Sequence, residues 1–150
     1  MALGTAQLDE DLKELRAAMS VLRIRWDALQ NESEELARGR QRYQDLFEFA
    51  SVAYLVTSPG CTIRETNRAA VRMLRFPAPM LAGKPFAVLV DLSQRREFRD
   101  RLAALRSGEA WPASWPVRMG RQGTARSRIS LEVRSMGTAA GFCWALRAAA

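Results

Sequence analysis

The 150-residue sequence offers few side chains that could carry out chemistry, because it contains no histidine. Without an imidazole the chain cannot form a Ser-His-Asp or Cys-His nucleophile pair, a histidine-ligated zinc or haem site, or a phosphoaccepting histidine. The two cysteines, Cys61 and Cys143, lie far apart and form no Cys-x-x-Cys motif. Isolated thiols in a chain with no secretory signal are typical of reduced cysteines that pack in the interior. We therefore expect no catalytic residues and no metal site, and interpret the protein as non-enzymatic.

Hydropathy and charge indicate the cellular compartment of this chain and the kinds of partner that it could bind. No segment approaches the roughly 18 apolar residues of a membrane span, so we expect a cytoplasmic protein without membrane contact. The net charge is +7, but residues 1–40 hold eight acidic and six basic residues, so the excess lies in the remainder. The arginines there are scattered, with no recognition helix and no interleaved aromatic platform. We interpret these arginines as a solvated surface. The next interpretation is that they bind an acidic protein partner, and we do not expect binding to nucleic acid.

The first predicted secondary-structure element is a long N-terminal helix. Nothing interrupts a helix over about residues 6–38, because the first proline is Pro59 and the only earlier glycines are Gly4 and Gly39. Apolar residues recur there at alternating spacings of 4 and 3, which is the narrow seam of a coiled coil. The predicted dimer seam comprises Leu8, Leu12, Leu15, Met19, Leu22, Trp26, Leu29, Leu36, Tyr43 and Phe47.

The heptad register favours a parallel homodimer. With Leu12 at position a, leucine occupies each d position from Leu8 to Leu36, and Asp11 at g faces Arg16 at e of a partner chain. Trp26 and Ser33 are poor a residues, so the seam weakens toward its C-terminal end, where residues 43–50 begin to pack on the following domain. An antiparallel pair or a higher oligomer remains compatible with the pattern.

The remaining hundred residues predict an α+β domain, because they contain no strand-helix-strand repeat. Residues 52–57 and 61–65 form a predicted hairpin around a Ser-Pro-Gly turn, and Asn67 is the predicted N-cap of a helix at 68–74. A helical turn at 80–81, a short element at 84–90 and a helix at 94–107 capped by Ser93 follow. The last predicted strands are residues 110–119, 126–134 and 141–147, separated by loops at 120–123 and 136–138.

Residues 43–146 resemble a PAS domain of bacterial signalling proteins. The resemblance rests on RYQDLFEFA at 42–50 leading into YLVT at 54–57, and on ETNRAA at 65–70. It continues with LAGKP at 81–85, REFR at 96–99 and WALR at 144–147. It implies a five-stranded antiparallel sheet in the order 2-1-5-4-3, with short helices on one face and a flanking helix that dimerises. The expected organisation is a coiled-coil segment at 1–42, a PAS domain at 43–147 and a tail at 148–150.

The resemblance also implies that a ligand is sometimes held between sheet and helices. Asn67 could contact such a ligand, although capping its helix is the favoured interpretation. Tryptophan on the inner face of the last strand is more often core, and the same holds for the other nominated side chains. The candidate pocket lining comprises Leu55, Ile63, Asn67, Met73, Leu74, Phe76, Phe86, Leu89, Phe98, Leu102, Leu131 and Trp144.

No cofactor is predicted, although a noncovalent flavin or another small organic ligand is compatible with the resemblance. Histidine-ligated haem is excluded, and neither Cys61 nor Cys143 lies in the Asn-Cys-Arg-Phe-Leu-Gln motif of light-sensing members. The chain also lacks the acidic residue and the Asp-x-Thr motif that many PAS domains carry before the first turn and after the last strand. If Ala150 is the native end, the N-terminal helix is the only output route.

The function expected from these observations is a non-catalytic, dimeric sensor or adaptor, in which the PAS core is coupled conformationally to the coiled coil and a signalling protein can be a partner. Three alternatives remain open: the sensory fragment of a longer histidine kinase or transcription regulator, a ligand-free oligomerisation scaffold, and a nucleic-acid-binding protein.

Overall fold

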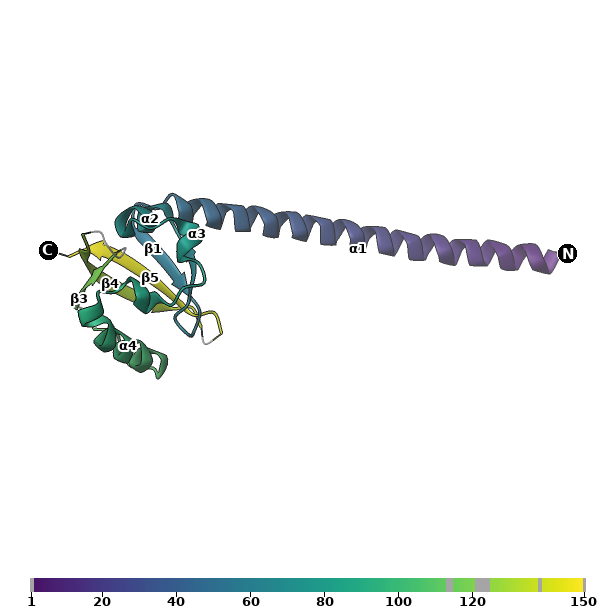
Figure 1. The fold of residues 1–150 in the computed structure, drawn as a ribbon. Helices are drawn as coiled ribbons and strands as arrows, with labels where there is room; N and C mark the ends of the chain where they lie inside the picture. The colour runs from purple at the N-terminus through teal and green to yellow at the C-terminus, as the bar shows by residue number, and fades with distance from the viewer. Residues whose placement is uncertain (1, 113–114, 121–124, 138, 150) are drawn as a thin grey trace. The chain divides into compact units, whose positions relative to one another are not determined.

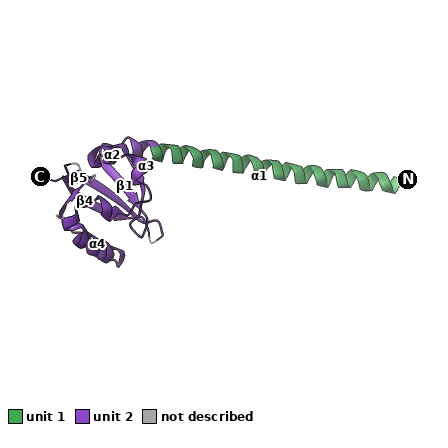
Figure 2. Cartoon of the chain, in the orientation of Figure 1, with its two compact units in different colours: residues 1–44 green, residues 45–150 purple. Residues whose placement is uncertain are grey.

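The computed structural model describes residues 2–112, 115–120, 125–137 and 139–149. The chain divides into two compact units, residues 1–44 and residues 45–150 (Figure 2). The first helix, α1 (Ala2–Glu48), begins in the first unit and ends in the second. Among the described residues, no helix is both long enough and apolar enough to cross a membrane.

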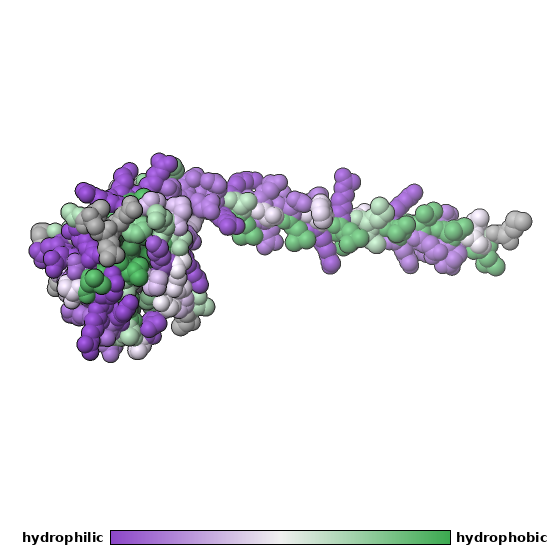
Figure 3. Space-filling model, viewed as in Figure 1, coloured by the Kyte–Doolittle hydropathy of each residue, from purple (hydrophilic) through white to green (hydrophobic). Residues whose placement is uncertain are grey.

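Helix α1 is longer than the sequence predicts, because it continues ten residues beyond Arg38. Gly39 does not end it: one glycine in a helix costs only about 1 kcal/mol relative to alanine, and no proline follows until Pro59. None of its residues is buried within the chain. The predicted seam residues from Leu8 to Tyr43 are all exposed, and Figure 3 shows apolar side chains following one another along the helix.

The second unit is built around one antiparallel sheet (Figure 1). Its strand order is β2-β1-β5-β4-β3, so the order expected from the resemblance is confirmed. The strands are β1 (Ala53–Thr57), β2 (Ile63–Thr66), β3 (Pro116–Met119), β4 (Ser127–Ser135) and β5 (Phe142–Ala148). The remaining elements are α2 (Arg68–Leu74), α3 (Ala78–Leu81), the 3-10 helix η1 (Phe86–Leu89) and α4 (Leu92–Arg106).

The helices pack on one face of this sheet and close a single hydrophobic core. Alternation along the strands places Leu55, Leu131 and Trp144 on that inner face. Leu74, Leu81, Phe86, Leu89, Phe98 and Leu102 join them from α2, α3, η1 and α4. The ring of Trp144 meets Phe86 edge-on at 4.8 Å, and Phe86 meets Phe98 at 5.4 Å. Aromatic pairs in this geometry add to the stability that burial alone provides.

Two predicted boundaries were wrong for local reasons. The N-cap of α4 is Asp91 rather than Ser93, because the Asp91 carboxylate accepts hydrogen bonds from both the backbone N–H and the hydroxyl of Ser93. The helix therefore covers Leu92–Arg106 rather than residues 94–107. The predicted strand at 110–119 shortens to Pro116–Met119, because proline cannot donate to a ladder and is favoured at the first position of a strand.

The first hairpin also differs in detail from the prediction. Cys61 donates its backbone N–H to Ser58, and Cys61 rather than Gly60 takes the left-handed conformation, with φ of 61°. Gly60 therefore lacks the positive φ that a type II turn requires at its third position, and β2 begins at Ile63 instead of residue 61. The predicted loops at 120–123 and 136–138 lie partly outside the described residues, which omit 121–124 and 138.

Candidate functional site

An open hollow lies between the C-terminal end of α4 and the inner side of β4. Its volume is about 930 Å³, which is within the range of small-molecule sites. We call it the α4–β4 hollow. The residues around it are Pro59, Leu105, Arg106, Gly108, Glu109, Ala110, Trp111, Pro112, Leu131, Glu132, Val133, Arg134, Ser135, Gly137, Gly141 and Phe142.

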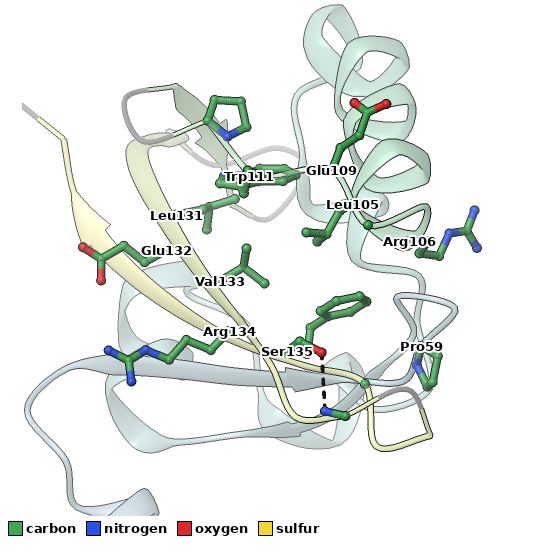
Figure 4. A pocket seen from close by; sticks show the side chains of 16 residues that line it. Pro59, Leu105, Arg106, Glu109, Trp111, Leu131, Glu132, Val133, Arg134 and Ser135 are labelled. Carbon is green, nitrogen blue, oxygen red and sulfur yellow. Dashed lines mark hydrogen bonds between the residues drawn. The ribbon is translucent and has the colours of Figure 1, made fainter.

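The side chains that face into the α4–β4 hollow are apolar. Figure 4 shows Leu105, Trp111, Leu131 and Val133 directed toward it, with the Trp111 ring lying between Leu131 and Leu105. In the same view, the charged ends of Arg106, Glu109, Glu132 and Arg134 point away from it. The alternation of β4 explains why Glu132 and Arg134 point away. A strand that turns Leu131 and Val133 inward must turn their neighbours outward.

Trp111 is the polar exception in this wall. Its indole nitrogen is buried and has no hydrogen-bond partner among the described residues. Its ring packs edge-on against Trp144 at 5.1 Å and Phe98 at 5.7 Å, and lies 5.9 Å from Trp115. A buried donor without an acceptor costs about 1–3 kcal/mol of stability.

Most of the nominated pocket-lining residues lie in the packed core. Met73 and Phe76 are partly buried against that core, and Leu131 lines the α4–β4 hollow as well. The other nine are buried: Leu55, Ile63, Asn67, Leu74, Phe86, Leu89, Phe98, Leu102 and Trp144. Sequence reasoning missed Leu105, Trp111, Val133 and Phe142, although the alternation of β4 and the Trp-Pro pair at 111–112 were signals for them.

Asn67 has a structural role, and its prediction as the N-cap of α2 is confirmed. Its Oδ1 accepts hydrogen bonds from the backbone N–H of Ala70 at 3.0 Å and of Tyr54 at 2.9 Å. Its Nδ2 donates to the carbonyl of Val52 at 2.8 Å. The fully buried amide therefore joins β1 to the start of α2 and presents little hydrogen-bonding capacity to a ligand.

A second buried polar pair joins β1 to β5. The Trp144 indole N–H donates to the hydroxyl of Thr57 at 3.0 Å, and both side chains are fully buried. The inner-face tryptophan is thus satisfied within the core, whereas Trp111 beside it is not. The wall of the α4–β4 hollow therefore contains a buried donor that has no acceptor among the described residues.

The two thiols are free, and neither is set up for nucleophilic chemistry. Burial raises the pKa of the Cys61 thiol, with Arg106 opposing the shift. Burial also raises the pKa of the Cys143 thiol. The nearby charge of Glu65 adds to this rise, and that of Arg134 opposes it. The thiolate is the reactive form, so both shifts disfavour reaction at neutral pH. The described residues contain no group of three or more His, Cys, Asp or Glu side chains that could hold a metal ion.

Within the second unit, the end of α1 and the residue after it contact β1 and α2. The ring of Phe47 stacks on Tyr54 of β1, with centroids 6.4 Å apart. Arg68, the first residue of α2, forms an ion pair with Glu48 at 3.3 Å and covers the ring of Phe49 at 4.7 Å. The helix end is therefore tied to β1 and to the residue that follows the Asn67 cap.

Comparisons with known proteins match this arrangement. A family model described as a PAS domain matches residues 41–109. Curated proteins give no match. Among solved structures, the PAS domain of an HTR-like protein from Haloarcula marismortui is 14% identical with a TM-score of 0.62, covering 80% of this chain and 99% of that one.

Two further structures share the fold. One is the PAS domain, in complex with ethanol, of a LuxR-family transcriptional regulator from Burkholderia thailandensis: identity 19%, TM-score 0.59, coverage 71% of this chain and 96% of that one. The other is the E. coli DhaR(N)-DhaL complex: identity 15%, TM-score 0.54, coverage 80% of this chain and 39% of that one.

Proposed function

Because the chain contains a PAS domain, we propose that it acts as a non-catalytic, dimeric sensor or adaptor in bacterial signal transduction. Its input is a ligand or a protein partner at the PAS core, and its output is a change in the packing of α1. The observation that carries the proposal is the row of exposed apolar side chains on a helix whose end is fixed to that core.

The dimer follows from the energetics of this row. Leu15 and Leu22 are 56% and 63% exposed in the single chain, so more than half of each side chain is available for burial. A coiled coil would bury them in knobs-into-holes packing, at about 1–1.5 kcal/mol per side chain. Repeated along α1 in both chains, this burial supports a homodimer, and we favour the parallel arrangement.

The coupling follows from the contacts at the end of α1. Phe47 and Glu48 touch Tyr54 and Arg68, which belong to the first strand and the first short helix of the core. A shift of β1 or α2 on binding would alter these contacts and so bias the packing of the helices. The exposed ion pair contributes little to stability, about 0–1 kcal/mol, which suits a contact that must rearrange.

A ligand-free oligomerisation scaffold is the second candidate, because the residues nominated for a pocket form a filled core. Denaturing protein purified from cells, followed by mass spectrometry and an absorbance scan, separates the two. Release of a stoichiometric small molecule contradicts the scaffold. The Burkholderia structure is the PAS domain of a transcriptional regulator, which keeps open that this chain acts as a sensory part of a longer regulator.

Sedimentation equilibrium tests the dimer. We expect a dimer at tens of micromolar, and a monomer there contradicts the proposal. The double variant Leu15→Glu/Leu22→Glu removes four apolar contacts per dimer, roughly 4–6 kcal/mol, so its Kd should rise by about three orders of magnitude or more. The matched control is Val21→Glu/Ile24→Glu, which alters equally exposed apolar residues outside the seam and should leave the dimer intact.

A disulfide tests the parallel arrangement. In a parallel coil, two copies of Leu8→Cys face each other at a d position and should oxidise to a covalent dimer. In an antiparallel coil paired along α1, the two sites would lie about 50 Å apart, because an α-helix rises 1.5 Å per residue. Absence of the covalent dimer in a protein that sediments as a dimer would therefore reverse the orientation.

A further inference from the structure

We infer that three arginines on the outer face of the sheet bind an acidic segment of a protein partner. These residues are Arg118 of β3, Arg128 of β4 and Arg147 of β5, and we call them the outer arginine cluster. The inference rests on the proposed function, because it assigns a chemical class to the protein partner of that function. It involves neither the α4–β4 hollow nor the seam of α1.

Strand alternation places the three side chains of the outer arginine cluster on one face. Their chain neighbours Val117, Ile129 and Leu146 are buried in the core, whereas the three arginines are exposed. Successive side chains of a strand point to opposite faces, so the arginines point away from the core and from the helices that cover it.

The positions of these arginines in the ladder bring like charges together. Arg118 and Arg128 lie directly opposite each other in the antiparallel pair β3–β4. Side chains at such positions begin about 4.5–5.5 Å apart, and like charges there destabilise a sheet. Arg147 lies opposite Ser130, so it is the diagonal neighbour of Arg128, at about 7–8 Å and within reach of a long side chain.

Little negative charge balances this cluster. Within the part of the chain that the structure describes, neither Arg118 nor Arg128 forms an ion pair. Arg147 approaches Glu132 only to 3.9 Å, and the two side chains are 61% and 67% exposed. By contrast, Arg126 is 14% exposed and is paired with Asp91 at 3.0 Å. The fold thus pairs the arginine that it buries and leaves the charge of the cluster open to another molecule.

Carboxylates suit this surface better than nucleic acid does. Guanidinium groups form bidentate hydrogen bonds with carboxylates. Single-stranded nucleic acid binds through aromatic side chains on which its bases stack, and the residues beside the cluster in the ladder include Pro116 and Ser130 instead. Because each exposed ion pair is weak, several carboxylates close together are needed. The partner segment therefore contains consecutive or nearly consecutive Asp and Glu residues.

A hexaglutamate peptide is the probe, titrated into the isotope-labelled full chain while NMR follows the backbone amide signals of β3 and β4. We expect a Kd of about 0.1–1 mM at low salt, rising at least about fivefold in 0.2 M NaCl because salt screens exposed charges. Arg118→Glu removes an attraction and adds a repulsion, so Kd should rise about tenfold. The matched control is Arg99→Glu, which alters net charge equally at an exposed position of α4 and should change Kd less than about twofold.

The same charge reversal has a readout without any ligand. Arg118→Glu places an acid directly opposite Arg128, so a repulsive pair becomes an attractive one and Tm should rise by about 1–6 °C at low salt. The rise should shrink in about 1 M NaCl. Should Arg118→Glu fail to fold, Arg118→Gln removes the repulsion without reversing the charge, and smaller changes in Tm and Kd of the same sign are expected.

Glu132→Gln tests the cluster in the opposite direction. It releases Arg147 from its ion pair and removes a negative charge beside the cluster. Hexaglutamate should therefore bind about two- to fivefold more tightly. Weaker binding to this variant would contradict the inference.

Four other results would overturn the inference. They are the absence of amide shifts with hexaglutamate at about 5 mM, equal weakening by Arg118→Glu and Arg99→Glu, tighter binding of single-stranded oligothymidine than of hexaglutamate, and conversion of the dimer to a monomer by Arg118→Glu. The third would assign the cluster to nucleic acid, and the fourth would assign it to a second copy of the chain. A native chain that sediments as a monomer contradicts the proposed dimer instead and leaves this inference untouched.

Discussion

Replacing Asn67 by alanine tests whether this buried amide holds the domain together or serves a ligand. The substitution removes three hydrogen bonds and leaves the N–H groups of Tyr54 and Ala70 and the carbonyl of Val52 without this partner. Loss of an N-cap costs about 1 kcal/mol, and each buried backbone group left unpaired adds about 1–3 kcal/mol unless water reaches it. We therefore expect a loss of roughly 3–7 kcal/mol, a large share of the total stability of an ordinary domain.

Urea denaturation followed by tryptophan fluorescence measures this loss, because Trp111, Trp115 and Trp144 lie in the second unit. Asn31→Ala is the matched control: Asn31 is exposed in the interior of α1, and alanine is a better helix former by less than about 1 kcal/mol. The reasoning is refuted if Asn67→Ala costs less than about 1 kcal/mol. A stable Asn67→Ala protein would favour the ligand-contact interpretation instead.

Three other perturbations follow from single contacts. Gly141→Ala should prevent the domain from folding or cost more than about 3 kcal/mol, because Gly141 has φ of 94° and an added Cβ would collide with the Thr57 carbonyl oxygen; soluble yield and thermal unfolding check this. Thr57→Val leaves the buried indole N–H of Trp144 unpaired and should cost about 1–3 kcal/mol in urea denaturation. Asp91→Asn should lower Tm at neutral pH and by much less at pH 2, because the contacts of Asp91 with Ser93 and Arg126 lower its pKa to about 2.

The direction of the pH effect at Asp91 follows from the thermodynamic linkage between protonation and folding. A carboxyl group whose pKa is lower in the folded than in the unfolded chain stabilises the fold above the unfolded value, near 4, and this contribution is lost as pH falls toward 2. The Tm difference between the native chain and Asp91→Asn should therefore shrink over that interval. A difference that stays constant between pH 5 and pH 2 would contradict the assignment. For the glycine prediction the control is Gly39→Ala, in open space within α1, which should not destabilise the protein.

Much of the fold was accessible from the sequence because it is recorded in local patterns. The period of 3.5 in α1, the alternation in β4 and the Asn67 cap each depend on residues that are close in the chain. The end of α1 and the start of α4 were misjudged because competing signals were both present there. Gly39 can end a helix or be tolerated within it, and Asp91 and Ser93 are both good caps.

The site was harder to predict. Periodicity shows which face of a helix or strand is apolar, but not whether two such faces pack closely or leave a hollow between them. Trp144 and Trp111 are both tryptophans against the same sheet, yet the partner of Trp144 is Thr57, and Trp111 has none among the described residues. That difference depends on contacts across 87 residues of chain, which no window of sequence contains. The residues nominated for a pocket therefore lie mainly in the core, and the α4–β4 hollow is lined mostly by other residues.

The position of the α4–β4 hollow has a consequence for how a signal would reach α1. Its walls include Phe142 at the start of β5, and β5 is paired with β1 from Phe142 opposite Thr57 to Leu146 opposite Ala53. The outer face of β1 carries Tyr54, on which Phe47 of α1 stacks. A molecule in the hollow thus contacts the strand adjacent to the one that holds the helix end. Since hydrogen-bonded strands move together more readily than they slip, we expect displacement of β1 and β5, rather than of α4, to carry the signal. Hydrogen exchange checks this: filling the hollow by Val133→Phe should alter protection at residues 45–50, and a change confined to α4 would contradict it.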